Sequence, residues 1–470
     1  MNYAQAVDHL YALGPELAPT SGAAKPLRKF DLAHIRALCR ELGNPQDRVP
    51  AVLIAGTNGK GSTAATLAAI LTAAGYRTGL YTSPHLIRIN ERIQVSDNGV
   101  LQPIADEDFA SYYARVDDAC EKLVAAHELA VVPSFFERVT AIAFLYYAER
   151  PDPVDVLVLE VGLGGRLDAT NVVEPLISVI TDIALDHQEY LGNTIREIAR
   201  EKCGILRPGG TLVTLSQHQE ANQAIGEMAA TLGVRGVNAA GYLPPAVRND
   251  AEQGSGAAIF RNQYQLHVEG VGLLSVDSPL GGQHQRRNIA LGIAAAIAIR
   301  NQNGYNITNS AIEQGIRNTI WPGRLEMIES GLLLDVAHNP AGAWTLRGAI
   351  STLPESQPRT LIFSCLRDKN LAEMSRILFS LFDSSADGDP LRRNDHLILA
   401  PIVSHRATDI ADLVSAAEVL GVPAIATADV AEALATARRV TPPNGLILAT
   451  GSVYLVGEIR QLVLRGVGRA

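Results

Sequence analysis

The chain has 470 residues, of which 47% are hydrophobic, and its 40 basic and 49 acidic residues give a formal net charge of −9. That length exceeds one core and predicts two or three domains. The charges are spread without long runs, which argues against a nucleic-acid or anionic-membrane surface. We therefore expect small-molecule partners, and neither nucleic acid nor membrane.

The cysteines and the apolar stretches indicate the compartment. Four cysteines form no C-x-x-C pair and have no metal-ligand spacing, which is typical of free thiols in a reducing cytosol. The first residues lack a basic start followed by an apolar stretch, so no secretory signal is predicted. The longest apolar stretch, 289–299, is about half of a membrane span and predicts a buried helix. We expect a cytoplasmic protein.

Residues 49–62 predict an apolar strand that runs into a glycine-rich turn, and an alanine-rich helix follows to about residue 74. The glycines let successive N–H groups point at one anion, Lys60 adds a positive charge, and the helix dipole points its positive end to the same place. Ile54 and Gly61 depart from the strict P-loop pattern. We interpret the turn as a variant loop for a nucleoside triphosphate rather than a plain glycine turn. Its residues are Gly56, Thr57, Asn58, Gly59, Lys60, Gly61 and Ser62.

Strand-like runs alternate with helix-length segments in the first 220 residues, which is the pattern of an α/β fold. The expected strands cover 51–55, 78–81, 154–161, 176–181 and 211–215. From residue 241 to residue 282 the chain is rich in Gly, Pro, Asn and Gln, which suggests hairpins at the rim of the sheet. Helices are expected next, at about 287–300 and 308–318.

After the Trp-Pro-Gly break at 321–323 the alternation restarts, with strands expected at 332–336, 359–363, 396–400, 424–427 and 446–450. We predict a second doubly wound sheet of ordinary domain size. The predicted domains are 1–320, with the nucleotide loop, and 324–470. Ligands of such sheets bind outside the carboxyl ends of the strands, so we expect a cleft between two domains that face each other.

Two strand ends in the first domain carry groups that suit a cation. Glu160 ends an apolar strand and is followed by three glycines. A carboxylate at a strand end beside a phosphate loop is where hydrated Mg²⁺ would find its ligand. Asp186 and His187 follow the next strand and are candidates for a second metal or a phosphate, with a structural histidine as an equally good interpretation.

Other polar residues are weaker signals in isolation. A hydroxyl of the turn 82–86 has the reach to contact a metal, and Lys202 alone is most simply interpreted as an exposed helix lysine. The amide of Asn288 suits an adenine edge, with a solvated helix start as the alternative. In the second domain the conspicuous polar clusters are 323–326, with Arg324, and 335–340, in which Asp335 and His338 lie at or just past a strand end.

Taken together, these motifs resemble those of the folylpolyglutamate synthase and dihydrofolate synthase family, a branch of the Mur ligase superfamily. The matching segments are GTNGKGS at 56–62, TSPHL at 82–86, LEVGLGGRLDATN at 159–171, DH at 186–187, EKCGIL at 201–206, WPGRLE at 321–326, DVAHNP at 335–340 and GSVYLVGE at 451–458. They span nearly the whole chain in the family's order. The resemblance implies an α/β protein with a Mur-ligase-like central P-loop ATPase domain and a C-terminal Rossmann-like glutamate-ligase domain.

The resemblance also implies roles for individual residues. Two Mg²⁺ ions would be bound by Ser83, Glu160, His187 and a carbamylated Lys202. Catalysis would involve Lys60, Lys202 and His187. The adenosine half of ATP would contact Asn288, Arg324 and Asp335. The pterin or pteroate site would be lined by Lys29, Phe30, Asp31, Ser134, Phe135, Phe136, Glu137, Leu167, Asp168 and Ala169. The incoming glutamate or the phosphates would contact His338 and Ser452.

The implied reaction is ATP-dependent amide formation. A carboxylate of the folate or pteroate attacks the γ-phosphate to give an acyl phosphate, and the amine of L-glutamate then displaces phosphate, with a domain closure that keeps water out. The run LDATN at 167–171 is similar to the bifunctional bacterial type. We therefore expect both dihydrofolate synthesis and polyglutamate extension of tetrahydrofolates, by a monomer.

Three alternatives remain at this point. One is a monofunctional folylpolyglutamate synthase. Another is a peptidoglycan Mur ligase, which carries an extra domain before the loop, whereas only 55 residues precede Gly56 here. The third is an ATP-binding regulator that forms no bond, which would not need Glu160, His187 and Lys202.

Overall fold

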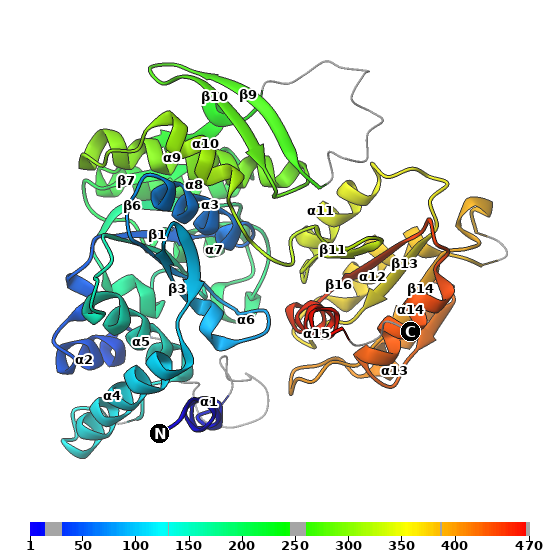
Figure 1. Cartoon of the computed structure of the whole chain (residues 1–470), viewed down its shortest axis with the longest axis horizontal. Helices are drawn as coiled ribbons and strands as arrows, with labels where there is room; N and C mark the ends of the chain where they lie inside the picture. Colours follow the sequence, from blue (N-terminus) through cyan, green and yellow to red (C-terminus); the bar gives the residue numbers. More distant parts are fainter. Residues whose placement is uncertain (15–30, 130, 245–259, 386–387, 467–470) are drawn as a thin grey trace. The chain divides into compact units, whose positions relative to one another are not determined.

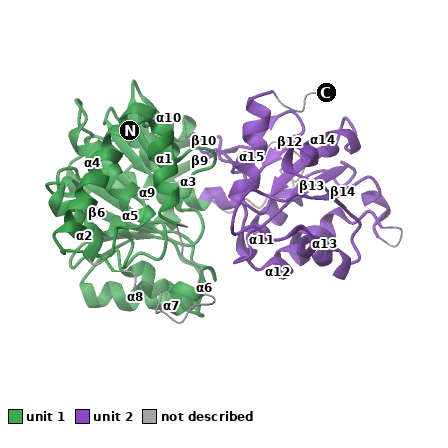
Figure 2. Ribbon diagram, turned by 90° about the horizontal axis from the view of Figure 1, so that it is seen from below, with its two compact units in different colours: residues 1–243, 265–275, 287–319 green, residues 244–264, 276–286, 320–470 purple. Residues whose placement is uncertain are grey.

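The computed structural model describes residues 1–14, 31–129, 131–244, 260–385 and 388–466 (Figure 1). The chain divides into two compact units (Figure 2). Unit 1 comprises residues 1–243, 265–275 and 287–319, and unit 2 comprises residues 244–264, 276–286 and 320–470.

Unit 1 contains an eight-stranded sheet with the order β4-β3-β2-β5-β1-β6-β7-β8. Six neighbouring strands, from β2 to β8 in that order, pair in parallel, and β3 and β4 form an antiparallel edge. The strands are β1 (Ala51–Ala55), β2 (Thr78–Tyr81), β3 (Ile93–Asp97), β4 (Val100–Pro103), β5 (Val156–Glu160), β6 (Pro175–Ile180), β7 (Thr211–Thr214) and β8 (Arg235–Asn238).

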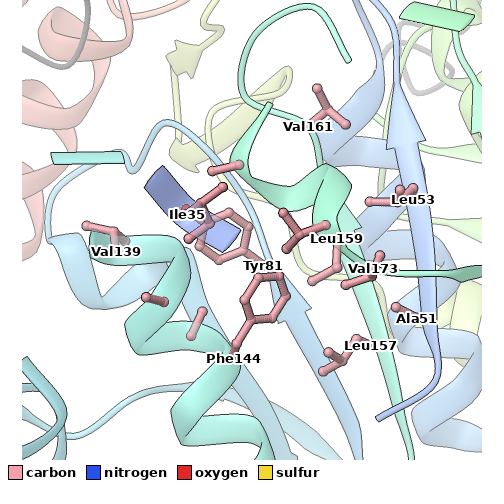
Figure 3. Packing of buried hydrophobic residues seen from close by; sticks show 14 of the residues in the cluster. Ile35, Ala51, Leu53, Tyr81, Val139, Phe144, Leu157, Leu159, Val161 and Val173 are labelled. Carbon is pink, nitrogen blue, oxygen red and sulfur yellow. The ribbon is translucent and has the colours of Figure 1, made fainter. Parts of the chain in front are cut away.

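Helices cover both faces of this sheet, which explains why every residue of β1 is buried and apolar. On one face Leu53, Leu157 and Leu159 pack with side chains of α2 and α5 (Figure 3). On the other side α10 packs against α3. The helices are α1 (Tyr3–Ala12), α2 (Ala33–Glu41), α3 (Lys60–Ala73), α4 (Asp106–Ala125), α5 (Phe135–Glu149), α6 (Gln188–Leu191), α7 (Ile195–Cys203), α8 (Gln219–Leu232), α9 (Gln283–Asn303) and α10 (Asn309–Arg317).

The segment between the two sheets contains the expected hairpin. β9 (Asn262–Val268) and β10 (Gly272–Ser278) pair as a two-stranded sheet. The earlier part of this segment, residues 245–259, lies outside the described residues. The apolar stretch 289–299 is a buried part of α9, which confirms the prediction of a buried helix.

Unit 2 contains a six-stranded sheet with the order β11-β12-β16-β13-β14-β15, and all five strands predicted after residue 324 are confirmed. The strands pair in parallel except β11, which is antiparallel to β12. The strands are β11 (Glu326–Glu329), β12 (Leu332–Leu334), β13 (Arg359–Phe363), β14 (His396–Leu399), β15 (Ala424–Ala426) and β16 (Leu446–Thr450). The helices are α11 (Pro340–Ile350), α12 (Leu371–Leu378), α13 (Ile410–Val419), α14 (Val430–Val440) and α15 (Val453–Leu464).

Two further sequence-based expectations concern the whole chain. All four cysteines are free and buried, so the prediction of unpaired thiols is confirmed. Within the described ranges, no helix combines the length and the apolar character that crossing a membrane requires.

Candidate active site

The first half of the loop after β1 is tied to the segment that follows β6. The N–H groups of Thr57 and Asn58 donate to the carbonyl oxygen of Asp182, at N···O distances of 2.8 and 3.2 Å. The Thr57 hydroxyl donates to the Ala184 carbonyl and accepts from the Ala184 N–H, both at 3.1 Å. The backbone amides of Thr57 and Asn58, which we expected to face a phosphate, therefore already have a protein acceptor.

The second half of the loop forms the N-terminus of α3. The first backbone hydrogen bond of this helix runs from the Thr63 N–H to the Gly59 carbonyl at 2.9 Å. The Lys60 ammonium lies 3.2 Å from the Thr57 carbonyl oxygen, folded against its own loop. The helix therefore presents a cation and its positive end in one place, which suits a phosphate group. The backbone donors before its first hydrogen bond are the N–H groups of Lys60, Gly61 and Ser62.

Two glycines of the loop sit where a side chain would collide. A Cβ on Gly56 would lie 1.8 Å from Thr181 Oγ1, and a Cβ on Gly59 would lie 2.2 Å from Asn288 Oδ1. Gly59 also has φ +87°, which L side chains rarely adopt. Because Asn288 belongs to the first turns of α9, the structure brings this predicted nucleotide residue onto the phosphate loop.

Gly59→Ala is expected to destabilise the protein by about 2–4 kcal/mol, because the left-handed backbone conformation and the collision with Asn288 add. Gly75→Ala is the matched control, since Gly75 has φ +92° with nothing within 4 Å of its would-be Cβ. The control reports only the backbone cost, about 1–2 kcal/mol. Urea unfolding measures both, and equal losses in the two variants would contradict the close approach of Asn288 to the loop.

Ser83 and Glu160 lie together because they follow the neighbouring strands β2 and β5. The Ser83 N–H donates to Glu160 Oε2 at 3.2 Å, and Glu160 is buried. The Ser83 hydroxyl oxygen is also buried, and no hydrogen-bond partner lies near it among the described residues. Buried hydroxyls are nearly always satisfied, so this one next to a carboxylate fits a cation ligand.

Lys202 is buried, so the interpretation as an exposed helix lysine is wrong. It lies on the inward face of α7, and its ammonium nitrogen is 2.8 Å from the carbonyl oxygen of Gly56. Burial, the largest cause, and the charge of Lys60 together lower the pKa of Lys202 to about 7, while the charges of Asp186 and Asp168 oppose the shift. Near neutral pH this side chain is therefore partly an uncharged amine beside the phosphate loop.

His187 precedes α6 with φ +50°, a left-handed conformation that is costly for a residue with a side chain. Its Nε2 lies 3.9 Å from Asp186 Oδ2. In the part of the chain that the structure describes, no group of three or more His, Cys, Asp or Glu side chains is placed to hold a metal. A cation here would therefore need Ser83 and a modified Lys202 in addition to Glu160 and His187.

In unit 2, the strands β12 and β16 are adjacent and parallel. Asp335 and His338 follow the carboxyl end of β12, and Ser452 follows that of β16. The Asp335 carboxylate is buried and accepts the N–H groups of Leu325 and Ala337 at 3.0 and 2.9 Å. Burial raises the pKa of Asp335, and the Arg324 guanidinium partly offsets this. His338 Nδ1 lies 2.8 Å from a carbonyl oxygen, which requires the proton on Nδ1. Ser452 accepts from the Tyr454 N–H and caps α15.

Comparison with known proteins identifies the family. Residues 323–453 match the family model of the Mur ligase, glutamate ligase domain. Over 437 residues the chain is 35% identical to the dihydrofolate synthase/folylpolyglutamate synthase of Bacillus subtilis. This alignment covers 92% of the chain and 95% of that relative. The chain belongs to the folylpolyglutamate synthase and dihydrofolate synthase family.

Solved structures of this family have the same fold. The Mycobacterium tuberculosis folylpolyglutamate synthase complexed with ADP superposes with a TM-score of 0.81 at 29% identity, over 98% of both chains. Escherichia coli FolC in complex with DHPP and ADP gives 0.77 at 27% identity, over 99% of this chain and 98% of that one. The Mur-ligase-like α/β architecture is thereby confirmed, and the chain is an ATP-dependent ligase of this family.

In this ligase, two of the predicted pteroate residues begin a helix. The Glu137 carboxylate accepts from the Ser134 N–H at 2.7 Å and the Ser134 hydroxyl at 2.6 Å, and the Glu137 N–H donates back to that hydroxyl at 3.4 Å. These bonds form a capping box at the start of α5. Phe135 is buried between them, and the half-buried Phe136 lies 6.2 Å from the Tyr81 ring centre. The pteroate roles of the four residues stay predictions.

Asp168 organises the glycine-rich loop after β5. Its Oδ2 accepts the N–H groups of Gly162 and Leu163, both at 3.0 Å, and its Oδ1 accepts the N–H and hydroxyl of Thr170 at 3.0 and 2.5 Å. Burial raises the pKa of this carboxyl group. Beside it Leu167 is half-buried and Ala169 is buried.

The third predicted pteroate segment is only partly described. Asp31 accepts the Ala33 N–H at 2.7 Å at the start of α2. Lys29 and Phe30 lie outside the described residues.

Asp182 was missed by the sequence analysis as a site residue. It contacts the loop through its backbone carbonyl, which any residue type has, so no sequence signal marks it. Its carboxylate pairs with Arg287, whose Nη2 lies 2.6 Å from Asp182 Oδ1. The two residues are 105 positions apart in the sequence, and nothing in the sequence indicates that they form an ion pair.

Proposed function

We propose that the protein joins L-glutamate both to dihydropteroate and to the glutamate tail of tetrahydrofolates, with cleavage of ATP. The observation that carries the proposal is the buried amine of Lys202, 2.8 Å from the carbonyl of Gly56 in the phosphate loop. The relatives support it, since the Mycobacterium tuberculosis structure contains ADP and the Escherichia coli structure contains DHPP with ADP. We assign ATP and pterin binding to residues 1–320 and glutamate ligation to residues 324–470.

The nucleotide would lie on the loop between β1 and α3. Lys60 and the backbone donors of the first turn of α3 would hold the β- and γ-phosphates, and Asn288 would contact the adenine, with Arg324 and Asp335 assigned to the adenosine half. The bonds from Thr57 and Asn58 to Asp182 O fix the loop before the nucleotide arrives. A preformed donor set loses little free energy to reorganisation on binding.

A second set of residues fits a divalent cation. The unsatisfied hydroxyl of Ser83, the buried Glu160 and the imidazole of His187 are the oxygen and nitrogen donors that Mg²⁺ accepts, and Lys202 would join them as a carbamate. Two bound Mg²⁺ ions would neutralise the charge of the phosphates.

Carbamylation explains why a lysine occupies this position. The neutral Nζ attacks the carbon of CO₂, an N–C bond forms, one C=O electron pair moves onto oxygen, and Nζ releases a proton to solvent. The product is an anion with two oxygens, which a hard dication prefers to an ammonium. A pKa of about 7 supplies the neutral amine that this step requires.

We infer a reaction in two steps. A carboxylate oxygen of the folate or pteroate bonds to the γ-phosphorus while the bond from that phosphorus to ADP breaks. The glutamate nitrogen then bonds to the acyl carbon, phosphate leaves with its electron pair, and the nitrogen loses a proton. Lys60 and the α3 amides hold the transferring phosphate in line, which is alignment and charge stabilisation rather than covalent catalysis by the protein.

A substrate panel tests this function. Phosphate release from ATP is measured with L-glutamate together with dihydropteroate, tetrahydrofolate or a UDP-muramoyl peptide, and the amide product is detected by mass spectrometry. We expect glutamate-dependent release and product with the first two acceptors only. Product with tetrahydrofolate alone would support the monofunctional enzyme, and turnover of the muramoyl peptide or release without any product would refute the proposal.

A further inference from the structure

The second turn of α9 is joined to the phosphate loop in two ways, once directly and once through Asp182. One is the contact of Asn288 with Gly59, where the missing side chain lets the amide reach the loop backbone. The other is the ion pair between Arg287 and Asp182. Arg287 and Asn288 are consecutive in sequence, so the position of one constrains the position of the other.

The ion pair is two-pronged. Arg287 Nη2 donates to Asp182 Oδ1 at 2.6 Å, and Arg287 Nε lies 3.1 Å from both carboxylate oxygens. Such a planar fork fixes direction as well as distance. Arg287 Nη2 also donates to the carbonyl of Ser216, just past β7, at 3.0 Å. The guanidinium therefore links α9 to the ends of two neighbouring strands.

Asp182 transmits this link to the phosphate loop through its backbone. Its carbonyl oxygen accepts the N–H groups of both Thr57 and Asn58. The flanking residue Thr181 donates its hydroxyl to the Asn58 carbonyl at 2.7 Å. A displacement of the Asp182 backbone would therefore move the half of the loop that orients the anion-binding turn.

We propose that Arg287 and Asp182 are positioning residues for ATP, which set the adenine-contacting Asn288 at a fixed place relative to the phosphate-binding turn. The role rests on the proposed ATP site but adds residues that lie outside the predicted contacts. The pair itself touches no reacting atom. The pair affects the affinity for ATP, because the protein must bind the adenine and the phosphates at the same time. It does not affect the affinity for the folate or for glutamate.

The test compares nucleotide affinity and Michaelis constants in the full chain. We expect Arg287→Ala to raise the Kd for ATP and the KM for ATP about tenfold, with the KM values for dihydropteroate and glutamate unchanged. Asp182→Ala should also raise both constants, and the double variant should be no worse than Arg287→Ala, because the pair of Arg287 with Asp182 is lost in all three variants. Arg287→Lys keeps the charge without the fork and should be intermediate.

Arg196→Ala is the matched control. Arg196 Nη2 lies 2.8 Å from both carboxylate oxygens of Glu227, and the two side chains are 37% and 43% exposed, compared with 30% and 42% for Arg287 and Asp182. A selective rise for ATP in the Arg287 and Asp182 variants but not in this control would support the inference. An equal rise in all three KM values, or additive effects in the double variant, would overturn it, because either outcome indicates general structural damage.

Lys60→Ala separates failure of this inference from failure of the proposed function. If it weakens ATP binding while Arg287→Ala and Asp182→Ala do not, only the positioning role is overturned. If it leaves ATP binding unchanged, the loop is not the nucleotide site, and both proposals fall. Should Arg287→Ala fold poorly, Asp182→Ala and Arg287→Lys carry the same comparison.

Discussion

Lys60→Ala is expected to lower turnover by about 10²- to 10³-fold, the loss seen when a donor to developing charge is removed from an active site. The Lys60 ammonium is the positive charge within the loop, and it donates a hydrogen bond to the carbonyl of Thr57 at 3.2 Å. That bond is local, so its loss should change the free energy of unfolding by less than about 1 kcal/mol. Single-turnover phosphate release and urea unfolding are the two measurements.

Lys122→Ala provides the comparison for Lys60→Ala, because Lys122 is an exposed lysine near the end of α4. It should leave both phosphate release and stability unchanged. Normal phosphate release by Lys60→Ala would show that the loop lysine has no part in the chemistry. A large loss of stability would instead assign Lys60 a structural role.

Lys202→Met is expected to lower turnover by about 10³-fold or more, because in the proposed mechanism Lys202 would be carbamylated and would supply a ligand of the metal site. The fold should tolerate the change, since Met has a similar volume and burial already disfavours the ammonium form, as the pKa of about 7 indicates. Short carboxylic acids such as formate should restore part of the activity by supplying the missing oxygens. No response of Lys202→Met to formate, together with near-normal activity, would remove Lys202 from the mechanism.

The carbamate also predicts a pH dependence. Only the neutral amine reacts with CO₂, so uptake should be half-maximal near pH 7, the pKa of Lys202, and should fall as the pH drops below it. At pH 8 about nine in ten Lys202 side chains are neutral, whereas an exposed lysine with a pKa near 10.4 is neutral in fewer than about one in a hundred molecules. A ¹³C signal from ¹³CO₂ that is absent in Lys202→Met measures this directly. The same signal in that variant would place the carbamate on another amine.

The sheet strands were predictable because buried parallel strands are continuous apolar runs. β1, β13 and β16 have the predicted bounds, and Glu160 ends β5 as expected. The antiparallel edge of β3 and β4 was not predicted, since β4 is mostly exposed and carries little apolar signal. Edge strands of this kind depend on pairing with a neighbour more than on their own composition.

The candidate site was predictable only in part. The loop and Glu160 follow from the strand–turn–helix pattern. The burial of Lys202 was missed, although Ile195, Ile198 and Ala199 precede it at the spacing of one helix face and mark the inward face of α7. The Ser-x-x-Glu spacing of Ser134 and Glu137 is a capping-box signature, and this signal was available in the sequence. The contact of the Asp182 carbonyl with the loop could not be predicted, because every residue type has a backbone carbonyl.

The most direct test of the account is a crystal structure with Mg²⁺ and a nonhydrolysable ATP analogue. We predict that the terminal phosphates lie within hydrogen-bond distance of Lys60 Nζ and the N–H groups of Gly61 and Ser62, with Mg²⁺ bound by Ser83 and Glu160. A triphosphate bound elsewhere, with the lysine loop empty, would contradict the account.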